Sequence, residues 1–182
     1  MQKLYLVIPC YNEEEVLPET SKQLRAKMET LMAAGKISKE SRIVFVNDGS
    51  KDRTWEIIES LHKENPLFQG IKLSRNKGHQ NALLAGLMTV KEHCDMAISM
   101  DADLQDPPSL LLEMYEAIVH EGYDSVATRR VNRNGEPVIR SFFARLFYKI
   151  MNHISDSKIV DGARDYRMMT RQMVDAILSM CE

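Results

Sequence analysis

Short apolar runs recur along the chain, separated by segments in which apolar residues follow a helical spacing. Each run is too short for a core helix and too continuously apolar for an exposed strand, which is typical of a largely parallel sheet covered on both faces. The predicted strands are Leu4–Pro9, Ile43–Asp48, Gly70–Ser74, Met96–Asp101 and Ser125–Thr128.

The segments between these runs carry helix signals. Asn12, with Glu15 three residues later, predicts the start of the first helix, and Gly35 predicts its end. Apolar or small residues at helical spacing mark one face of each helix: Leu17, Leu24, Met28 and Leu31; Trp55, Ile58 and Leu61; Ala82, Ala85 and Gly86 within 78–93; and Leu111, Tyr115 and Ile118 after the pair Pro107 and Pro108. A last helix is expected over Arg171–Met180. The alternation of strands and helices predicts an α/β fold with a doubly wound, mostly parallel sheet and right-handed crossovers.

Length and composition favour one domain. The chain has 182 residues, of which 44% are hydrophobic, enough for one sizeable core but few for two independent domains. Its formal net charge of -2 argues against a general nucleic-acid binder. Cys10, Cys94 and Cys181 are widely spaced and form no CxxC pair, which favours unpaired thiols in a reducing compartment over disulfides or a zinc site.

The pattern changes after about Arg129, where arginines become frequent and the segment Ser141–Ile154 alternates aromatic residues with cations. Two interpretations stay open for that segment, an ordinary packing helix and a helix lying at a membrane surface. The chain begins with no signal-peptide pattern, and no run approaches the roughly 20 apolar residues that cross a bilayer. We therefore expect this chain by itself to be soluble.

Polar loops follow the first four predicted strands, and ligands of open α/β sheets bind beyond the carboxyl ends of the strands. The dinucleotide fingerprint GxGxxG and the phosphate loop GxxxxGK[ST] are both missing, so a phosphate group needs another binding device. Asp101 and Asp103 offer one, because two carboxylates at a strand end can share a hard divalent cation that also binds a diphosphate. Paired acids also cap helices or stay solvated, and that alternative remains open.

Residues at the first two strand ends are candidates for holding a nucleoside. Asp48 could accept a hydrogen bond from a base, or it could fix its own turn while Ser50 caps the next helix. Tyr11 offers a stacking face with a polar tip, and Glu13 could reach ribose hydroxyls.

Five motifs stand in an order and at separations that resemble family 2 glycosyltransferases with the GT-A fold, a Rossmann-like fold of nucleotide-diphospho-sugar transferases. They are VIPCYNEE, IVFVNDGSKDRT, LSRNKGHQNALLAG, SMDADLQDPP and DGARDYRMM. The set is most similar to polyprenyl-phosphate and dolichol-phosphate sugar transferases, especially the bacterial membrane-anchored glucosyl type. The resemblance covers nearly the whole chain.

The resemblance implies roles for particular residues. The donor-binding residues would be Pro9, Tyr11, Glu13, Asp48, Asn76, Gly78, His79, Asp101, Ala102 and Asp103. The ligands of Mg²⁺ or Mn²⁺ would be Asp103 and Gln105, with Asp101. Asp165 matches the proposed catalytic base, although a surface ion pair with a neighbouring arginine is its plainer alternative. The residues that would meet acceptor or phosphate are Arg129, Arg133, Arg164 and Arg167. Where relatives often read Asn-x-Gly-Lys, this chain has His79 in place of the lysine, and its role is open.

The resemblance implies an inverting transfer of a sugar, glucose as first choice, from a UDP-sugar to a polyprenyl phosphate. Such an acceptor is already anionic, so Asp165 would orient it rather than remove a proton. The alternatives are a soluble enzyme acting on a glycan or protein hydroxyl, a non-catalytic nucleotide-sugar binding module, and a nucleotidyltransferase. The last would carry a glycine-rich loop after the first strand, where this chain has Cys10, Tyr11 and Asn12.

The resemblance also implies an organisation. Residues 1–182 are expected to form one catalytic domain, with a nucleotide-sugar binding core over about 1–128 and an acceptor and membrane-proximal part over about 129–182. Full-length relatives of the glucosyl type carry a C-terminal membrane region, which this chain lacks. The full-length protein is therefore expected at the cytoplasmic face of the cell membrane, in contact with the membrane through Ser141–Ile154, and a homo-oligomer is left open.

Overall fold

The structure is a computed structural model that describes residues 1–129 and 163–180. The chain divides into two compact units, one holding Met1–Val126 with Asp165–Glu182 and the other holding Ala127–Arg164. Residues 165–182 thus belong to the same compact unit as residues 1–126, and most of the second unit lies outside the described residues. The division into a nucleotide-sugar binding core over about 1–128 and an acceptor part over about 129–182 stays a prediction. The predicted helix Ser141–Ile154 lies outside them as well.

A six-stranded sheet has the order β3-β2-β1-β4-β6-β5. Its strands are β1 (Leu4–Cys10), β2 (Arg42–Asn47), β3 (Phe68–Lys72), β4 (Met96–Ser99), β5 (Ser125–Arg129) and β6 (Ala163–Thr170). Strand β1 pairs in parallel with β2 and β4, and β2 pairs in parallel with β3, whereas β6 runs antiparallel to β4. The predicted α/β fold with a mostly parallel sheet is confirmed.

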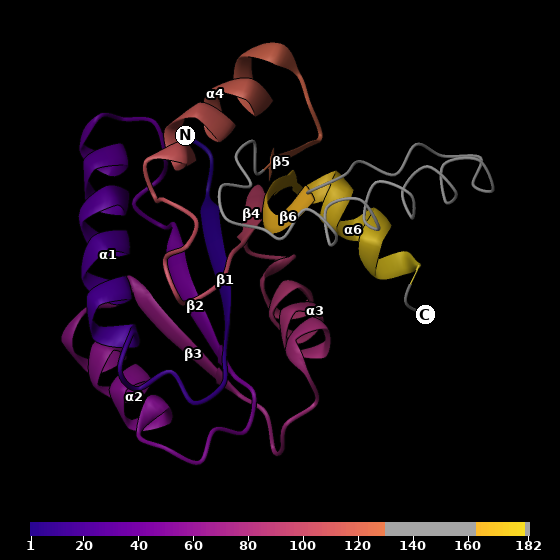
Figure 1. The fold of residues 1–182 in the computed structure, drawn as a ribbon. Helices are drawn as coiled ribbons and strands as arrows, with labels where there is room; N and C mark the ends of the chain where they lie inside the picture. The colour runs from indigo at the N-terminus through magenta and orange to yellow at the C-terminus, as the bar shows by residue number, and fades with distance from the viewer. Residues whose placement is uncertain (130–162, 181–182) are drawn as a thin grey trace, which may run out of the picture. The chain divides into compact units, whose positions relative to one another are not determined.

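Helices cover both faces of the sheet, as the continuously apolar strands predicted. They are α1 (Leu17–Ala33), α2 (Thr54–Glu64), α3 (His79–Val90), α4 (Leu110–Glu121) and α6 (Arg171–Ser179). Alternate residues of β1 serve two cores, because Leu6 and Ile8 pack with α1, α2 and α4 while Tyr5 and Val7 pack with α3 and α6. Figure 1 shows α1 and α2 on one side of the sheet and α3 on the other.

The predicted end of α1 is right and its predicted start is wrong. Gly35 adopts a left-handed conformation with φ of 68°, and its N–H donates to the carbonyl of Met32 in a Schellman motif. The helix begins at Leu17 without a side-chain cap. Asn12, the predicted cap, instead has φ of 56° and its Oδ1 accepts from the N–H of Lys51 at 2.9 Å.

Strand β6 was not predicted, although Asp165 and Arg167 alternate with apolar residues as in a strand, because the segment was interpreted only as a site motif. Tyr166 and Met168 are fully buried on one face of the sheet, and Met169 is buried on the other. The consequence is that β6 brings Asp165 beside the end of β4. In the part of the chain that the structure describes, no helix has the length and apolar character to span a membrane.

Candidate active site

A cavity of about 250 Å³ lies at the carboxyl ends of β1 and β2, between the loop after β4 and the start of α3. Its lining is Pro9, Cys10, Tyr11, Glu13, Asp48, Asn76, Gly78, His79, Asp101, Ala102 and Asp103. All ten residues predicted to bind the donor are therefore brought together around one space, with Cys10 as the added member. A cavity in which Asp101 and Asp103 faced away from Tyr11 and Asp48 would have ruled out a shared site.

The loop after β1 is held by the loop after β2 through backbone-to-side-chain hydrogen bonds. The N–H of Asn12 donates to Ser50 Oγ at 3.0 Å, and the N–H of Glu13 donates to Thr54 Oγ1 at 2.8 Å. Ser50 therefore does not cap α2, whose first position has no side-chain cap. These contacts fix the backbone that presents Tyr11 and Glu13 to the cavity.

Asp48 is almost fully buried, and both of its carboxylate oxygens are engaged. Oδ1 accepts from the N–H of Lys77 at 2.7 Å and Oδ2 accepts from the N–H of Gly78 at 2.9 Å. Asp48 thus holds the loop before α3, a role that neither interpretation of the sequence foresaw. Each oxygen retains a further lone pair, and Asp48 lines the cavity, so a base contact stays a prediction.

The loop after β4 carries the predicted cation ligands, and a side chain of α1 holds its backbone in place. Thr20 Oγ1 donates to the carbonyl of Ala102 at 2.6 Å in a buried contact. The carboxylate of Asp103 accepts from the N–H of Gln105 at 3.1 Å and from Gln105 Nε2 at 2.6 Å. Asp103 and Gln105 therefore contact each other, and their roles as ligands of one ion stay predictions.

Negative charge accumulates in the cavity. Burial raises the pKa of Asp101, and the charges of Asp103 and Asp165 raise it further while His79 opposes them. Burial also raises the pKa of Glu13, with the charges of Asp103, Asp52 and Asp101 adding to it. Carboxylates that disfavour one another's charged form are stabilised by a cation placed among them.

The donor set fits a hard cation only in part. Within residues 1–129 and 163–180, no group of three His, Cys, Asp or Glu side chains stands close enough to hold a metal. The predicted ligands Asp101, Asp103 and Gln105 offer two carboxylates and one amide oxygen. Mg²⁺ is commonly held by one or two carboxylates together with substrate phosphates, and this set suits that arrangement.

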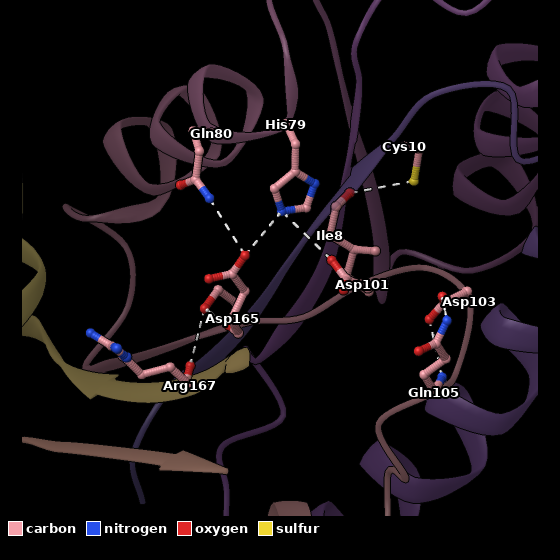
Figure 2. Close-up of polar contacts among 10 residues, drawn as sticks. Ile8, Cys10, His79, Gln80, Asp101, Asp103, Gln105, Asp165 and Arg167 are labelled. Atoms are coloured by element: carbon pink, nitrogen blue, oxygen red, sulfur yellow. Dashed lines mark hydrogen bonds and ion pairs between the residues drawn. The ribbon is translucent and has the colours of Figure 1, made fainter. Parts of the chain in front are cut away.

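His79, at the start of α3, lies between two carboxylates from different strand ends (Figure 2). Its Nε2 is 3.6 Å from Asp101 Oδ1 and 3.8 Å from Asp165 Oδ2. The backbone carbonyl of Asp165 accepts from Ser99 Oγ at 2.5 Å, which ties β6 to the end of β4. Asp165, the predicted catalytic residue, is therefore placed beside Asp101 by residues of the same compact unit.

The predicted cationic residues are only partly described. Arg167 lies on β6, and its guanidinium extends away from Asp165 in Figure 2. Arg129 and Arg164 belong to β5 and β6, but their side chains lie outside the described part of the chain, and Arg133 lies outside it entirely. Their roles stay predictions.

Several site residues were missed by sequence reasoning. Gln80 follows His79 within the motif LSRNKGHQNALLAG, and its Nε2 donates to Asp165 Oδ2 at 3.4 Å. Ser99 and Thr20 act through backbone carbonyls, which no side-chain pattern marks. Gly49 has φ of 68°, and a Cβ there would stand 2.5 Å from the backbone nitrogen of Asn76. The sequence DGS could have indicated this conformation, because glycine is the usual residue at such φ values.

A larger cavity of about 640 Å³ lies along the edge strand β3 and is lined in part by Trp55, His62, Gly70 and His93. Among the described residues that line it, Glu59 alone bears a carboxylate. The smaller cavity is the candidate active site because the acidic side chains and their perturbed pKa values converge there.

Comparison of the sequence with known proteins identifies the family of this chain. The sequence matches the model of Glycosyl transferase family 2 over residues 5–178. It is 40% identical to the uncharacterised glycosyltransferase YkoT of Bacillus subtilis, over 96% of this chain and 51% of that protein. It is 39% identical to the prophage bactoprenol glucosyl transferase homolog of Escherichia coli, over 99% of this chain and 56% of that protein. The chain thus spans about half the length of these relatives.

The fold is also that of solved glycosyltransferase structures. Glucosyl-3-phosphoglycerate synthase from Mycobacterium tuberculosis, crystallised with Mn²⁺, UDP and glucosyl-3-phosphoglycerate, superposes with a TM-score of 0.59 at 17% identity, over 94% of this chain and 58% of that chain. This similarity concerns the fold, which is the GT-A fold expected from the motifs. With the family model covering nearly all of its residues, the chain belongs to glycosyl transferase family 2.

Proposed function

We propose that this chain is the catalytic part of an inverting glycosyltransferase that moves glucose from UDP-glucose to a polyprenyl phosphate. One observation carries the proposal: the ten predicted donor-binding residues line a single cavity, and Asp165 lies 3.8 Å from His79, one of the lining residues. The relative named as a bactoprenol glucosyl transferase homolog supports the choice of sugar and acceptor.

The cavity suits part of a nucleotide-sugar. Its volume of about 250 Å³ lies below the roughly 300 to 1,000 Å³ of most small-molecule sites, so part of the donor would project beyond it. Tyr11 is partly exposed at the rim and offers a ring face for the base. Glu13, whose backbone N–H donates to Thr54, would accept hydrogen bonds from ribose hydroxyls.

We also propose that a divalent cation joins the donor to the protein through Asp101, Asp103 and Gln105. Such an ion would offset the charge that builds on the departing diphosphate. The crystallised neighbour with Mn²⁺ and UDP supports this class of cofactor, and the mutual destabilisation of the carboxylates gives the physical reason.

The protein's own part in the reaction follows from where its groups lie. The carboxylates of Asp101 and Asp103 would hold the cation that offsets the charge of the donor's diphosphate, and Asp48 would keep the loop before α3 in place beside it. Asp165 stands on the other side of His79 from Asp101 (Figure 2). A polyprenyl phosphate is already anionic, so Asp165 would orient the attacking group for an in-line displacement with inversion.

Transfer is tested directly with purified protein, this chain and any longer protein that its gene encodes. The assay uses radiolabelled UDP-glucose, undecaprenyl phosphate in detergent and Mn²⁺, and it measures labelled lipid. Asp103→Ala is expected to lower the rate about 100-fold or more, whereas Asp175→Ala on the exposed side of α6 is expected to leave it unchanged. Near-normal turnover of Asp103→Ala with saturating Mn²⁺ would contradict the assignment.

The donor and the competing functions are resolved by a thermal-shift screen of UDP- and GDP-sugars with Mn²⁺, because a ligand of the native state raises the unfolding temperature. The largest shift is expected with UDP-glucose. A shift without transfer to any acceptor would favour a binding module, and transfer to a glycan or protein but not to lipid would favour the alternative enzyme. Contact with a membrane and a homo-oligomer stay predictions.

A further inference from the structure

The side chain of Asp165 is held by the first turn of α3. Gln80 Nε2 donates to Asp165 Oδ2 at 3.4 Å, and His79 Nε2 stands 3.8 Å from the same oxygen. The same His79 nitrogen stands 3.6 Å from Asp101 Oδ1. Figure 2 shows both side chains of α3 directed toward the Asp165 carboxylate, with the Asp103 and Gln105 pair set apart from them.

These contacts restrain a carboxylate that is otherwise free to rotate. Asp165 is exposed, with 56% of its side-chain surface accessible, and the hydrogen bond from Ser99 reaches its backbone carbonyl rather than its side chain. The carboxylates of Asp165 and Asp101 both lie within 4 Å of the same nitrogen of His79. Like charges at this range repel, so an unrestrained Asp165 side chain would rotate toward solvent and away from the cavity.

The amide of Gln80 and the imidazole of His79 contact Asp165 in different ways. Gln80 supplies an N–H to one oxygen of Asp165 and brings no charge of its own. The imidazole of His79 stands between Asp165 and Asp101 and so separates the two carboxylates.

The turn that carries these two residues is itself held rigidly. The N–H of Gly78 donates to Asp48 Oδ2 at 2.9 Å, and the carbonyl of Gly78 accepts from the N–H of Ala82 at 3.0 Å inside α3. Site groups are positioned well when their supporting residues are locked by hydrogen bonds of their own. The loop after β2 therefore sets the place of His79 and Gln80.

We propose that Gln80, together with His79, is a positioning residue that aims the Asp165 carboxylate into the candidate active site. The proposal rests on the function proposed for Asp165 above. It assigns Gln80 a part in the reaction through Asp165 and not through the donor, since Gln80 is absent from the lining of the cavity.

A double-mutant cycle separates this role from a structural one. Gln80→Ala and Gln80→Glu are made in the wild type and in the Asp165→Ala variant. The Glu variant places a second carboxylate beside Asp165. Gln23→Glu, on the exposed side of α1, is the control for the same change of charge away from the site.

In the transfer assay, Gln80→Ala is expected to lower kcat about 10-fold and Gln80→Glu about 100-fold, in the range found for residues that orient an active group. The KM for UDP-glucose is expected to stay within about twofold, because Gln80 would not bind the donor. In the Asp165→Ala background neither change should lower kcat further. Equal losses in both backgrounds would overturn the proposal, as would a loss confined to KM.

Crystal structures show the position of Asp165 independently of the transfer assay. They are determined for the wild type, for Gln80→Glu and for the double variant His79→Ala, Gln80→Ala. The Asp165 carboxylate is expected to leave its wild-type rotamer in both variants. An unchanged rotamer in the double variant would overturn the proposal even where transfer is normal. A wild type that transfers no sugar from UDP-glucose would refute the proposed function instead, and the crystal structures would still decide the role of Gln80.

Discussion

The carboxylate of Asp48 accepts a hydrogen bond from the backbone N–H of Gly78 at 2.9 Å. A second bond, from the N–H of Lys77 at 2.7 Å, engages its other oxygen. Asp48 immediately follows β2, and Gly78 immediately precedes α3. The end of β2 and the turn that carries His79 are therefore one connected structure.

Asp48→Asn is expected to destabilise the protein by about 1–3 kcal/mol, the usual cost of a buried polar group left without its partner. The amide keeps the shape of the side chain but offers one acceptor oxygen for two backbone donors. Urea unfolding measures the free energy of unfolding, with Asp175→Asn, an exposed position of α6, as the control. An unchanged free energy of unfolding would show that Lys77 and Gly78 do not depend on this carboxylate.

Gly49→Ala and Gly122→Ala separate backbone strain from steric overlap. Both glycines have positive φ, 68° and 77° respectively, so both substitutions cost roughly 1–2 kcal/mol from conformation alone. A Cβ at Gly49 would also stand 2.5 Å from the backbone nitrogen of Asn76, whereas nothing lies within 4 Å of one at Gly122. Gly49→Ala is expected to cost about 1–3 kcal/mol more in chemical denaturation. Equal losses of stability in the two variants would mean that the loops that contain Gly49 and Asn76 move apart without cost.

Gly86→Ala tests the close packing of α3 on the sheet. Alanine is the better helix former by about 1 kcal/mol, so a purely local effect would stabilise the protein. A Cβ at Gly86 would overlap the side chains of Val7 and Val46, and overpacking typically costs about 1–3 kcal/mol. A net loss of stability is expected in thermal unfolding, with Met88→Ala, an exposed position one half-turn on, as the control. A stabilised variant would contradict the packing.

The fold was largely predictable because local patterns and tertiary structure agree in its core. The five predicted strands are all present, each with ends within two residues of those observed. The small residues predicted to bring α3 close to the sheet include Ala82 and Gly86, both buried. Strand β6 escaped prediction because it is paired with β4, far away in the chain, and no local signal specifies that partner.

The candidate site was also predictable where local motifs specify it and not where tertiary contacts do. The residues that line the cavity stand in recognisable motifs at strand ends, and the predicted donor-binding set includes every lining residue but Cys10. Asn12 and Ser50 were expected to cap helices, but each bonds the neighbouring loop instead. A side-chain oxygen can satisfy either kind of backbone N–H, and only the tertiary structure decides which one it meets. Gln80 was missed for a related reason, since its partner lies on a strand that had not been predicted.

The raised pKa of Glu13 predicts a pH-dependent effect on stability. Burial is the main cause, followed by the charges of Asp103, Asp52 and Asp101. A folded-state pKa above the unfolded value means that the folded protein binds this proton more tightly. The contribution of Glu13 to stability is therefore fully present below its unfolded pKa, about 4.3, and is lost as the pH rises through the raised folded value.

Glu13→Gln removes that charge with little change of shape. In EDTA, the unfolding temperature of Glu13→Gln is expected to exceed that of the wild type at pH 8. The difference between the two is expected to be smaller or reversed at pH 4. Adding Mn²⁺ at pH 8 is expected to stabilise the wild type more than the variant, because a cation offsets the charge that the variant lacks. Glu121→Gln, on the exposed end of α4, is the matched control. A Glu13→Gln variant less stable than the wild type at pH 8 without cation would show that the ionised carboxylate has a favourable partner, and the acidic cavity would then need no ion to balance it.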